Sequence, residues 1–205
     1  MHRPAESAEA LEETARASRG TEKRDALRKL AAVRLWSAED ADSEQDATRQ
    51  RRALVRAVRD ARGFNRSAAV GAELSFYELW SGWRAGRDSA ERLAERYVES
   101  EREAGELLFF AWILRGEMAL AREDFPQAAE SFRFLLVHLD HPLYAFALWR
   151  TAHCYRGMGR DEDATQALRD VDALGQRSEA SEFVRRIAAV ARHELGPAPP
   201  PAANP

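Results

Sequence analysis

An internal repeat constrains the fold of this chain more than any other feature of its sequence. The stretches 109–141 and 145–175 carry similar residues at a constant offset of 36, so that Trp112 aligns with Leu148 and Gly116 with Ala152. The other aligned pairs are Ala119 and Tyr155, Phe125 and Asp161, Ala128 and Ala164, Phe132 and Leu168, and Leu135 and Val171. A fixed period of this length is typical of proteins built from stacked repeats.

Each copy of the repeat predicts two helices joined by a short turn. Apolar residues recur every three or four positions over 107–120 and again over 125–139, which is helical spacing. In the second copy, Gly157 or Gly159 can end a helix in the left-handed conformation, and Asp161 can cap the next helix. Small residues at the aligned positions would let paired helices approach closely, so we expect burial of Trp112, Gly116, Ala128, Phe132, Ala152, Tyr155, Ala164 and Leu168.

These residues resemble the tetratricopeptide repeat (TPR) family. The family pattern is matched by Trp112, Gly116, Phe125, Ala128 and Phe132, and then by Leu148, Ala152, Tyr155, Gly159, Ala164 and Leu168. The first copy departs from the pattern at Arg115 and Ala119, and the linker 140–144 lengthens the period beyond the family's 34 residues. The resemblance covers about a third of the chain and implies an all-α fold of antiparallel helix pairs stacked as a short solenoid. The alternative is a generic antiparallel helical bundle.

The expected organisation has three parts. Residues 1–62 read as a polar and basic helical extension, in which 1–19 form a frayed or isolated helix at best. Residues 63–196 read as the TPR-like domain, with 67–103 as a divergent first repeat and a lone terminal helix that caps the array. The Pro-rich tail 197–205 is expected to be disordered. We expect helix ends near Gly20, Gly63, Gly86, Asp124, His141, Gly159 and Gly175.

Composition and charge exclude several classes of protein. A net charge of −3 argues against a general nucleic-acid binder, and a single cysteine, Cys154, excludes an internal disulfide. The longest apolar run, 107–114, is too short for a membrane span. The first residues lack the apolar core of a signal peptide, so a cytoplasmic location is expected, although a periplasmic protein whose signal had been removed would look the same.

One basic stretch indicates an anionic partner more than the rest of the chain does. Residues 49–66 hold seven arginines against one acid, Asp60. Such a run favours nucleic acid or an anionic membrane when aromatic residues interleave with it, and none do here. We therefore interpret it as a solvated helix face that pairs with the acids of 37–46, and no nucleic-acid partner is expected.

No arrangement of residues in the sequence predicts catalysis. The pair His138 and His141 would need a further ligand to hold a metal ion. Cys154 and His153 cannot act as nucleophile and base, because neighbouring side chains on a helix diverge. Phosphate-binding and hydrolase motifs are absent from the sequence. The expectation is a non-enzyme without cofactor or metal.

The TPR resemblance implies a concave groove lined by the first helix of each repeat. The matching positions that we expect to bind a partner are Phe110, Ile113, Glu117, Phe146, Trp149, Arg150, His153, Arg156, Arg185 and Arg192. Apolar residues come first and basic ones later, which favours a partner segment with an apolar part and an acidic part. Four arginines without compensating acids (Arg150, Arg156, Arg185 and Arg192) would attract the acidic part.

Two functions agree with this reading. The first is a non-catalytic protein–protein interaction scaffold that binds a partner segment in the groove. The alternative is a structural or assembly subunit of a bacterial envelope or motility complex, acting by self-association or hetero-association. The oligomeric state separates them, because a scaffold that awaits its partner should be monomeric.

Overall fold

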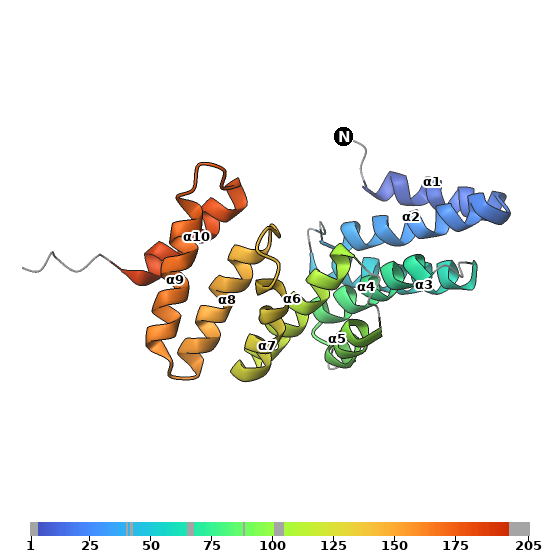
Figure 1. Ribbon diagram of the computed structural model, residues 1–205. Coiled ribbons are helices and arrows are strands. Elements are labelled where there is room, and N and C mark those ends of the chain that lie inside the picture. Colours follow the sequence, from blue (N-terminus) through green and yellow to red (C-terminus); the bar gives the residue numbers. More distant parts are fainter. Residues whose placement is uncertain are drawn as a thin grey trace, which may run out of the picture. The chain divides into compact units, whose positions relative to one another are not determined.

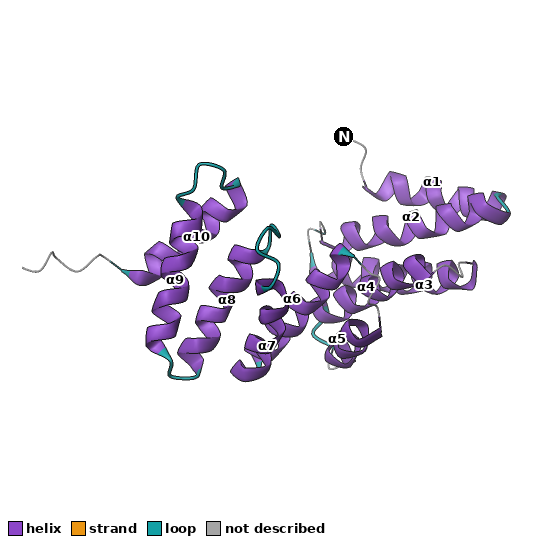
Figure 2. Cartoon of the chain, viewed as in Figure 1, coloured by secondary structure: helices purple, strands orange, loops and turns teal. Residues whose placement is uncertain are grey.

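The described part of the chain is entirely helical. The computed structural model describes residues 4–39, 41, 43–64, 68–87, 89–100 and 105–196, and within these ranges it has ten α-helices and no strand (Figures 1 and 2). The helices are α1 (Pro4–Ala17), α2 (Gly20–Glu39), α3 (Glu44–Phe64), α4 (Ala68–Arg84), α5 (Ser89–Ser100), α6 (Glu106–Ala121), α7 (Phe125–Leu136), α8 (Tyr144–Gly157), α9 (Asp161–Gly175) and α10 (Glu182–Leu195). The all-α, repeat-like fold class is confirmed. The expectation of a disordered tail at 197–205 lies outside the described residues.

The chain divides into two compact units between Ala111 and Trp112. This division differs from the boundary expected at residue 63, because polar contacts tie α4 to α2. Glu73 of α4 bonds to Arg28 of α2 at 2.5 Å, and the indole N–H of Trp80 donates to Glu39 at 3.1 Å. The helices α4 and α5 therefore belong to the first unit, together with α1–α3.

The first helix of the chain packs tightly instead of fraying. Ala8 and Ala15 of α1 are buried, and they join one apolar cluster with Leu27, Leu30 and Ala31 of α2. The expectation of an isolated helix at 1–19 was wrong, because a stripe of alanines buries little area per residue but allows close helix contact. The same cluster takes in Leu54, Ala57, Val58 and Ala61 of α3.

The two helix pairs of the second unit end and begin at positions 36 residues apart. α6 ends at Ala121 and α8 at Gly157, while α7 begins at Phe125 and α9 at Asp161. The turn hydrogen bonds repeat as well. Asp124 N–H donates to Ala119 at 2.9 Å, and Arg160 N–H donates to Tyr155 at 2.8 Å. The internal repeat seen in the sequence is thus also a repeat of backbone geometry.

One capping expectation was wrong and is explained by this register. Asp124 is the N-cap of α7, and its carboxylate accepts a hydrogen bond from Gln127 N–H at 3.2 Å. The residue 36 positions later is Arg160, which is the N-cap of α9 and makes no side-chain cap. Asp161 instead lies in the first turn of α9, where an acid is stabilised by the helix dipole.

The turn between α4 and α5 has the same local form, as a divergent first repeat would. Gly86 has a φ of 61°, and Arg87 N–H donates to Gly82 five residues earlier at 3.0 Å. Ala90 is buried, as are Ala128 and Ala164 in the later pairs. These two helices nevertheless group with the first unit by their contacts.

Burial in the second unit follows the predicted pattern with two exceptions. Gly116, Ala128, Phe132, Ala152, Ala164 and Leu168 are buried, whereas Trp112 and Tyr155 are half-buried. The indole of Trp112 stacks on Phe134 at 5.0 Å between ring centroids. Arg160 lies over the ring of Tyr155 at 4.4 Å. Both large rings thus cover the core at its edge.

Candidate partner-binding face of α8

The predicted partner-binding residues of α8 lie on one side of that helix. Phe146, Trp149, Arg150, His153 and Arg156 are spaced by three or four residues, which places them along a single helical face. The ring centroids of Phe146 and Trp149 are 5.8 Å apart, and those of Trp149 and His153 are 4.8 Å apart. We call these five residues the α8 face. All of them are half-buried except Arg156, which is exposed.

Arg150 is bound by an acid from the preceding first helix. Its guanidinium makes a two-point contact with the carboxylate of Glu117 of α6, and one of the two bonds, from Nε to Oε1, is 2.5 Å long. Both side chains are about one-fifth exposed. The same guanidinium lies over the Trp149 ring at 5.1 Å. Two-point pairing with a carboxylate is the geometry that arginine prefers.

Three side chains of the α8 face contact the carboxylate of Glu194 of α10. Its carboxylate accepts hydrogen bonds from Trp149 Nε1 at 2.8 Å and Arg156 Nη1 at 2.8 Å, and it lies 3.2 Å from His153 Nε2. Burial alone would raise the pKa of the Glu194 carboxyl group. The hydrogen bonds from Trp149, Arg156 and His153 outweigh burial and lower that pKa below its usual value.

His153 links the two acids into one network. Arg150 Nη1 lies 3.2 Å from His153 Nδ1, and a guanidinium nitrogen can only donate. The imidazole that fits therefore accepts at Nδ1 and donates from Nε2 to Glu194. The network runs from Glu117 through Arg150 and His153 to Glu194, and so joins the first helices α6, α8 and α10.

The premise of uncompensated arginines was wrong for three of the four. Arg150 is paired with Glu117, and Arg156 with Glu194 at 2.8 Å. Arg192 of α10 bonds to Asp172 of α9 at 2.6 Å. Arg185 donates to the backbone oxygen of Ser178 at 3.3 Å. The compensating acids were missed because the sequence does not reveal which acids lie beside the arginines in space.

The structure brings together only part of the predicted set. Glu117 and the α8 face are joined by bonds and ring contacts, whereas Arg185 and Arg192 are held by other partners. Ile113 is half-buried on α6. Phe110 belongs to the first unit, where its ring lies 6.4 Å from that of Phe76.

Glu194 is the residue of this site that the sequence analysis missed. It lies in the last turn of α10, where a carboxylate is disfavoured by the helix dipole. An acid in that position signals a compensating contact elsewhere, and this signal was available from the sequence.

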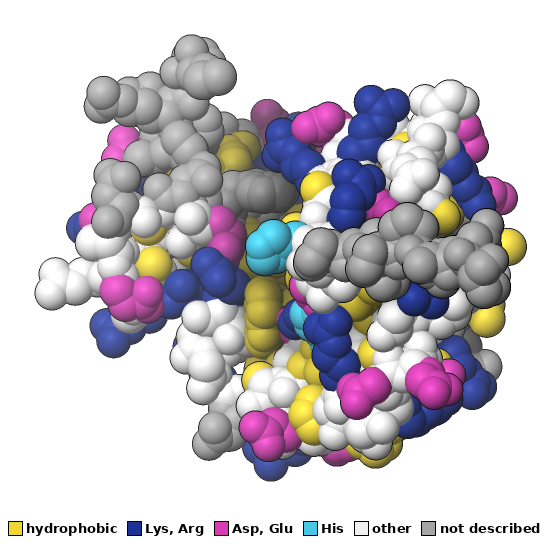
Figure 3. Space-filling model, turned by 90° about the vertical axis from the view of Figure 1, so that its left-hand side faces the viewer, with side chains coloured by type: hydrophobic (Ala, Val, Ile, Leu, Met, Phe, Trp, Pro, Cys, Tyr) yellow, Lys and Arg dark blue, Asp and Glu magenta, His cyan; other side chains and the backbone are white. Residues whose placement is uncertain are grey.

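Charged side chains of both signs lie close together on the surface of the molecule. On the face that Figure 3 shows, Lys and Arg side chains lie next to Asp and Glu side chains, with hydrophobic side chains visible between them. The pairing of Arg156 with Glu194 and of Arg192 with Asp172 fits this pattern. Among the described residues, no group of three or more His, Cys, Asp or Glu side chains is placed to hold a metal ion.

Cys154 lies behind the α8 face, inside the helix pair. Its side chain is buried, and burial raises the pKa of its thiol to about 11, with Arg150 opposing part of the rise. A thiol with a raised pKa is a poor nucleophile at neutral pH.

In the α7–α8 loop, His141 makes a local contact: its Nδ1 accepts a hydrogen bond from Leu143 N–H at 3.1 Å.

Comparison with known proteins finds no matching family model, no matching curated protein and no matching solved structure. Among the described helices, none combines the length and the apolar content needed to cross a membrane.

Proposed function

We propose that this chain is a non-catalytic protein-binding scaffold of the TPR type, whose α8 face receives a segment of a partner protein. The observation that supports this most is the row of three rings, Phe146, Trp149 and His153, on one side of a first helix. Aromatic side chains held in fixed orientations give contact area at low entropic cost, and they are enriched at protein interfaces.

The partner segment is recognised mainly by apolar contact, with charge in a secondary role. Glu117 and Glu194 already occupy the guanidinium groups of Arg150 and Arg156. An incoming carboxylate would have to displace one of them. Arg156 is the more accessible of the two arginines, with 42% of its side chain exposed, so it is the one that meets an acid of the partner.

A pair of variants tests this proposal. The double change Phe146→Ala with Arg156→Glu should abolish capture of the partner from native cells, while leaving helical circular dichroism near that of the wild type. The matched control is Arg169→Glu on α9, an exposed arginine without an ion pair to the described residues. Capture is read by affinity purification and mass spectrometry. Retention of the same partner by the double variant would refute the proposed face.

Reversal of Arg150 would be a less clean test than reversal of Arg156. A glutamate at 150 would face Glu117 in a half-buried position, so the variant would lose stability as well as binding. A glutamate at 156 would face Glu194 in turn, but the loss of stability is smaller because the side chain of Arg156 is more exposed.

Self-association is a second candidate function, and α10 carries the observation that favours it. Phe183 and Val190 lie on α10 with 40% and 43% of their surface exposed. Terminal repeats of stacked arrays normally need a polar outer face to stay soluble. Light scattering coupled to size-exclusion chromatography separates the two functions. A dimer that becomes monomeric in Phe183→Ser would favour assembly, and a concentration-independent monomer would favour the scaffold.

A further inference from the structure

A groove in the first unit is lined by three helices. It has a volume of about 470 Å³. Its lining comes from α1, α2 and α3, and it includes the apolar residues Leu27, Leu30 and Phe64 and the basic residues Lys23 and Arg56. It belongs to neither the repeated helix pairs nor the α8 face.

The groove is long enough for about three turns of a helix. Its α2 wall runs from Lys23 to Arg34, and its α3 wall runs from Ala53 to Phe64. Eleven residues of helix span roughly 16 Å on each wall. Lys23 lies beside Phe64 at one end, and Arg34 bonds to Gln50 towards the other, so the two walls are antiparallel.

The floor of the groove is apolar. Leu27, Leu30 and Ala57 are buried members of the cluster that holds α1, α2 and α3 together. Phe64 lies at the end of the groove with 48% of its surface exposed. Lys23 Nζ is 4.8 Å from the centroid of this ring. An apolar side chain of a guest would make its main contact with the exposed ring of Phe64, because Leu27 and Leu30 on the floor are only 5% and 6% exposed.

The rim of the groove carries two cations that form no ion pair with the described residues. Glu12 is bound by both Arg16 and Arg34. Lys23 and Arg56 form no ion pair with the described residues, and neither does Asp60, the other acid of the rim. Four cations against two acids leave the lining net positive.

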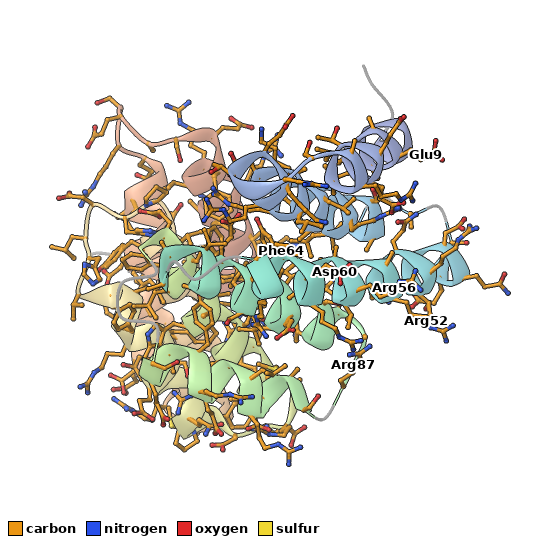
Figure 4. The ribbon with its side chains drawn as sticks, turned by 90° about the vertical axis from the view of Figure 1, so that its right-hand side faces the viewer. Glu9, Arg52, Arg56, Asp60, Phe64 and Arg87 are labelled. Atoms are coloured by element: carbon orange, nitrogen blue, oxygen red, sulfur yellow. The ribbon has the colours of Figure 1, made fainter. Side chains whose placement is uncertain are left out.

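Two further arginines extend this charge along α3. Arg52, Arg56 and Arg59 are exposed and make no ion pair or hydrogen bond with the part of the chain that is described. Figure 4 shows Arg52, Arg56, Asp60 and Phe64 following one another along α3. Like charges three and four residues apart on a helix repel each other, so an anionic guest would relieve this repulsion.

We propose that this groove binds an acidic amphipathic helix of a partner protein. The apolar stripe of that helix would lie on Leu27, Leu30 and Phe64, and its carboxylates would meet Lys23, Arg52 and Arg56. A phosphate backbone uses the arginines but gains nothing from an apolar floor, so an acidic helix fits both features better. The proposal does not depend on the α8 face, which lies in the other unit.

The test uses the full chain and a synthetic probe. The probe is a fluorescein-labelled helical peptide with leucines at a spacing of three and four residues and glutamates elsewhere. Fluorescence anisotropy should show saturable binding that weakens as salt rises. Arg56→Glu should weaken binding by roughly three- to tenfold, because it replaces an attraction by a repulsion. A peptide with serines in place of the leucines should also bind more weakly.

The matched control is Arg92→Glu on α5, an exposed arginine of the same unit that lines no part of the groove. It changes the net charge equally and should leave the affinity unchanged. Equal losses in Arg56→Glu and Arg92→Glu would overturn the proposal, as would absence of binding at a peptide concentration of about 1 mM. A short DNA duplex with the same net charge as the peptide serves as competitor. If it displaced the peptide and bound with higher affinity, the arginines would be assigned to nucleic acid instead.

Discussion

The ring of Phe132 lies directly against Gly116. A Cβ atom built on Gly116 would stand 2.6 Å from Phe132 Cζ, closer than real Cβ contacts come. We expect Gly116→Ala to destabilise the second unit by about 1–2 kcal/mol, because overpacking outweighs the higher helix propensity of alanine. Urea unfolding measures this change. Gly71→Ala on α4 is the opposite control, since its Cβ meets nothing within 4 Å, and it should stabilise by roughly 0.5–1 kcal/mol.

Glu123 has the backbone conformation that Gly159 adopts in the next helix pair. Its φ is 61° and that of Gly159 is 72°, and the two residues are 36 positions apart. A side chain in this region costs about 1–2 kcal/mol. Glycine avoids this cost, but part of the gain is lost because its unfolded chain has a higher conformational entropy. Glu123→Gly should therefore raise the free energy of unfolding by roughly 0.5–1 kcal/mol. Glu123→Ala keeps the strain and should give no such gain in thermal or urea unfolding.

Cys154 should be unreactive in the folded protein. With its pKa raised to about 11, the thiol holds roughly a hundredfold less thiolate at pH 8 than a free cysteine does. Its side chain is also buried. Alkylation by iodoacetamide, followed by mass spectrometry, should be slow until urea unfolds the chain. Fast labelling of the folded protein would contradict the packing of α8.

Glu194 should contribute stability that depends on pH. Because its folded-state pKa is lowered, the carboxylate stabilises the fold above the pKa of an unfolded glutamate, about 4.3. This contribution is lost as the pH falls through the lower folded-state pKa. We expect Glu194→Gln to cost about 1–2 kcal/mol at pH 7, with the difference from wild type narrowing below about pH 4.

The control for Glu194 is Glu162→Gln, an exposed acid in the first turn of α9 without an ion pair to the described residues. It should change the free energy of unfolding by less than about 0.5 kcal/mol at any pH. Equal effects of the two changes would mean that the bonds to Trp149 and Arg156 contribute nothing.

The backbone of the repeated pairs was predictable because its determinants are local. The spacing of apolar residues and the positions of Asp124 and Gly159 placed the turns within a few residues of where they lie. The predicted end of α7 near His141 was less accurate, because the helix ends at Leu136, five residues earlier. The residues between them include no glycine, and the one cap-type residue, Asp140, lies next to His141 and not at the end of the helix.

The side-chain network was not predictable because it depends on which helices become neighbours. Nothing near Arg150 in sequence indicates Glu117 of another helix as its partner. The packing of α1 through Ala8 and the bond between Glu39 of α2 and Trp80 of α4 were missed for the same reason. Both contacts join helices whose proximity the sequence does not reveal. The identity of a binding partner depends on a second molecule and is therefore a matter for the experiments above.

The position of Glu194 in the chain has a consequence for how the protein emerges from the ribosome. Its three donors, Trp149, His153 and Arg156, are translated 38 to 45 residues before it. During synthesis these side chains therefore lack the Glu194 carboxylate as their acceptor until α10 has been made. The α8 face reaches its final form only when α10 packs against it. A nascent chain halted before residue 194 would present the same aromatic row to chaperones with its polar groups still open to water.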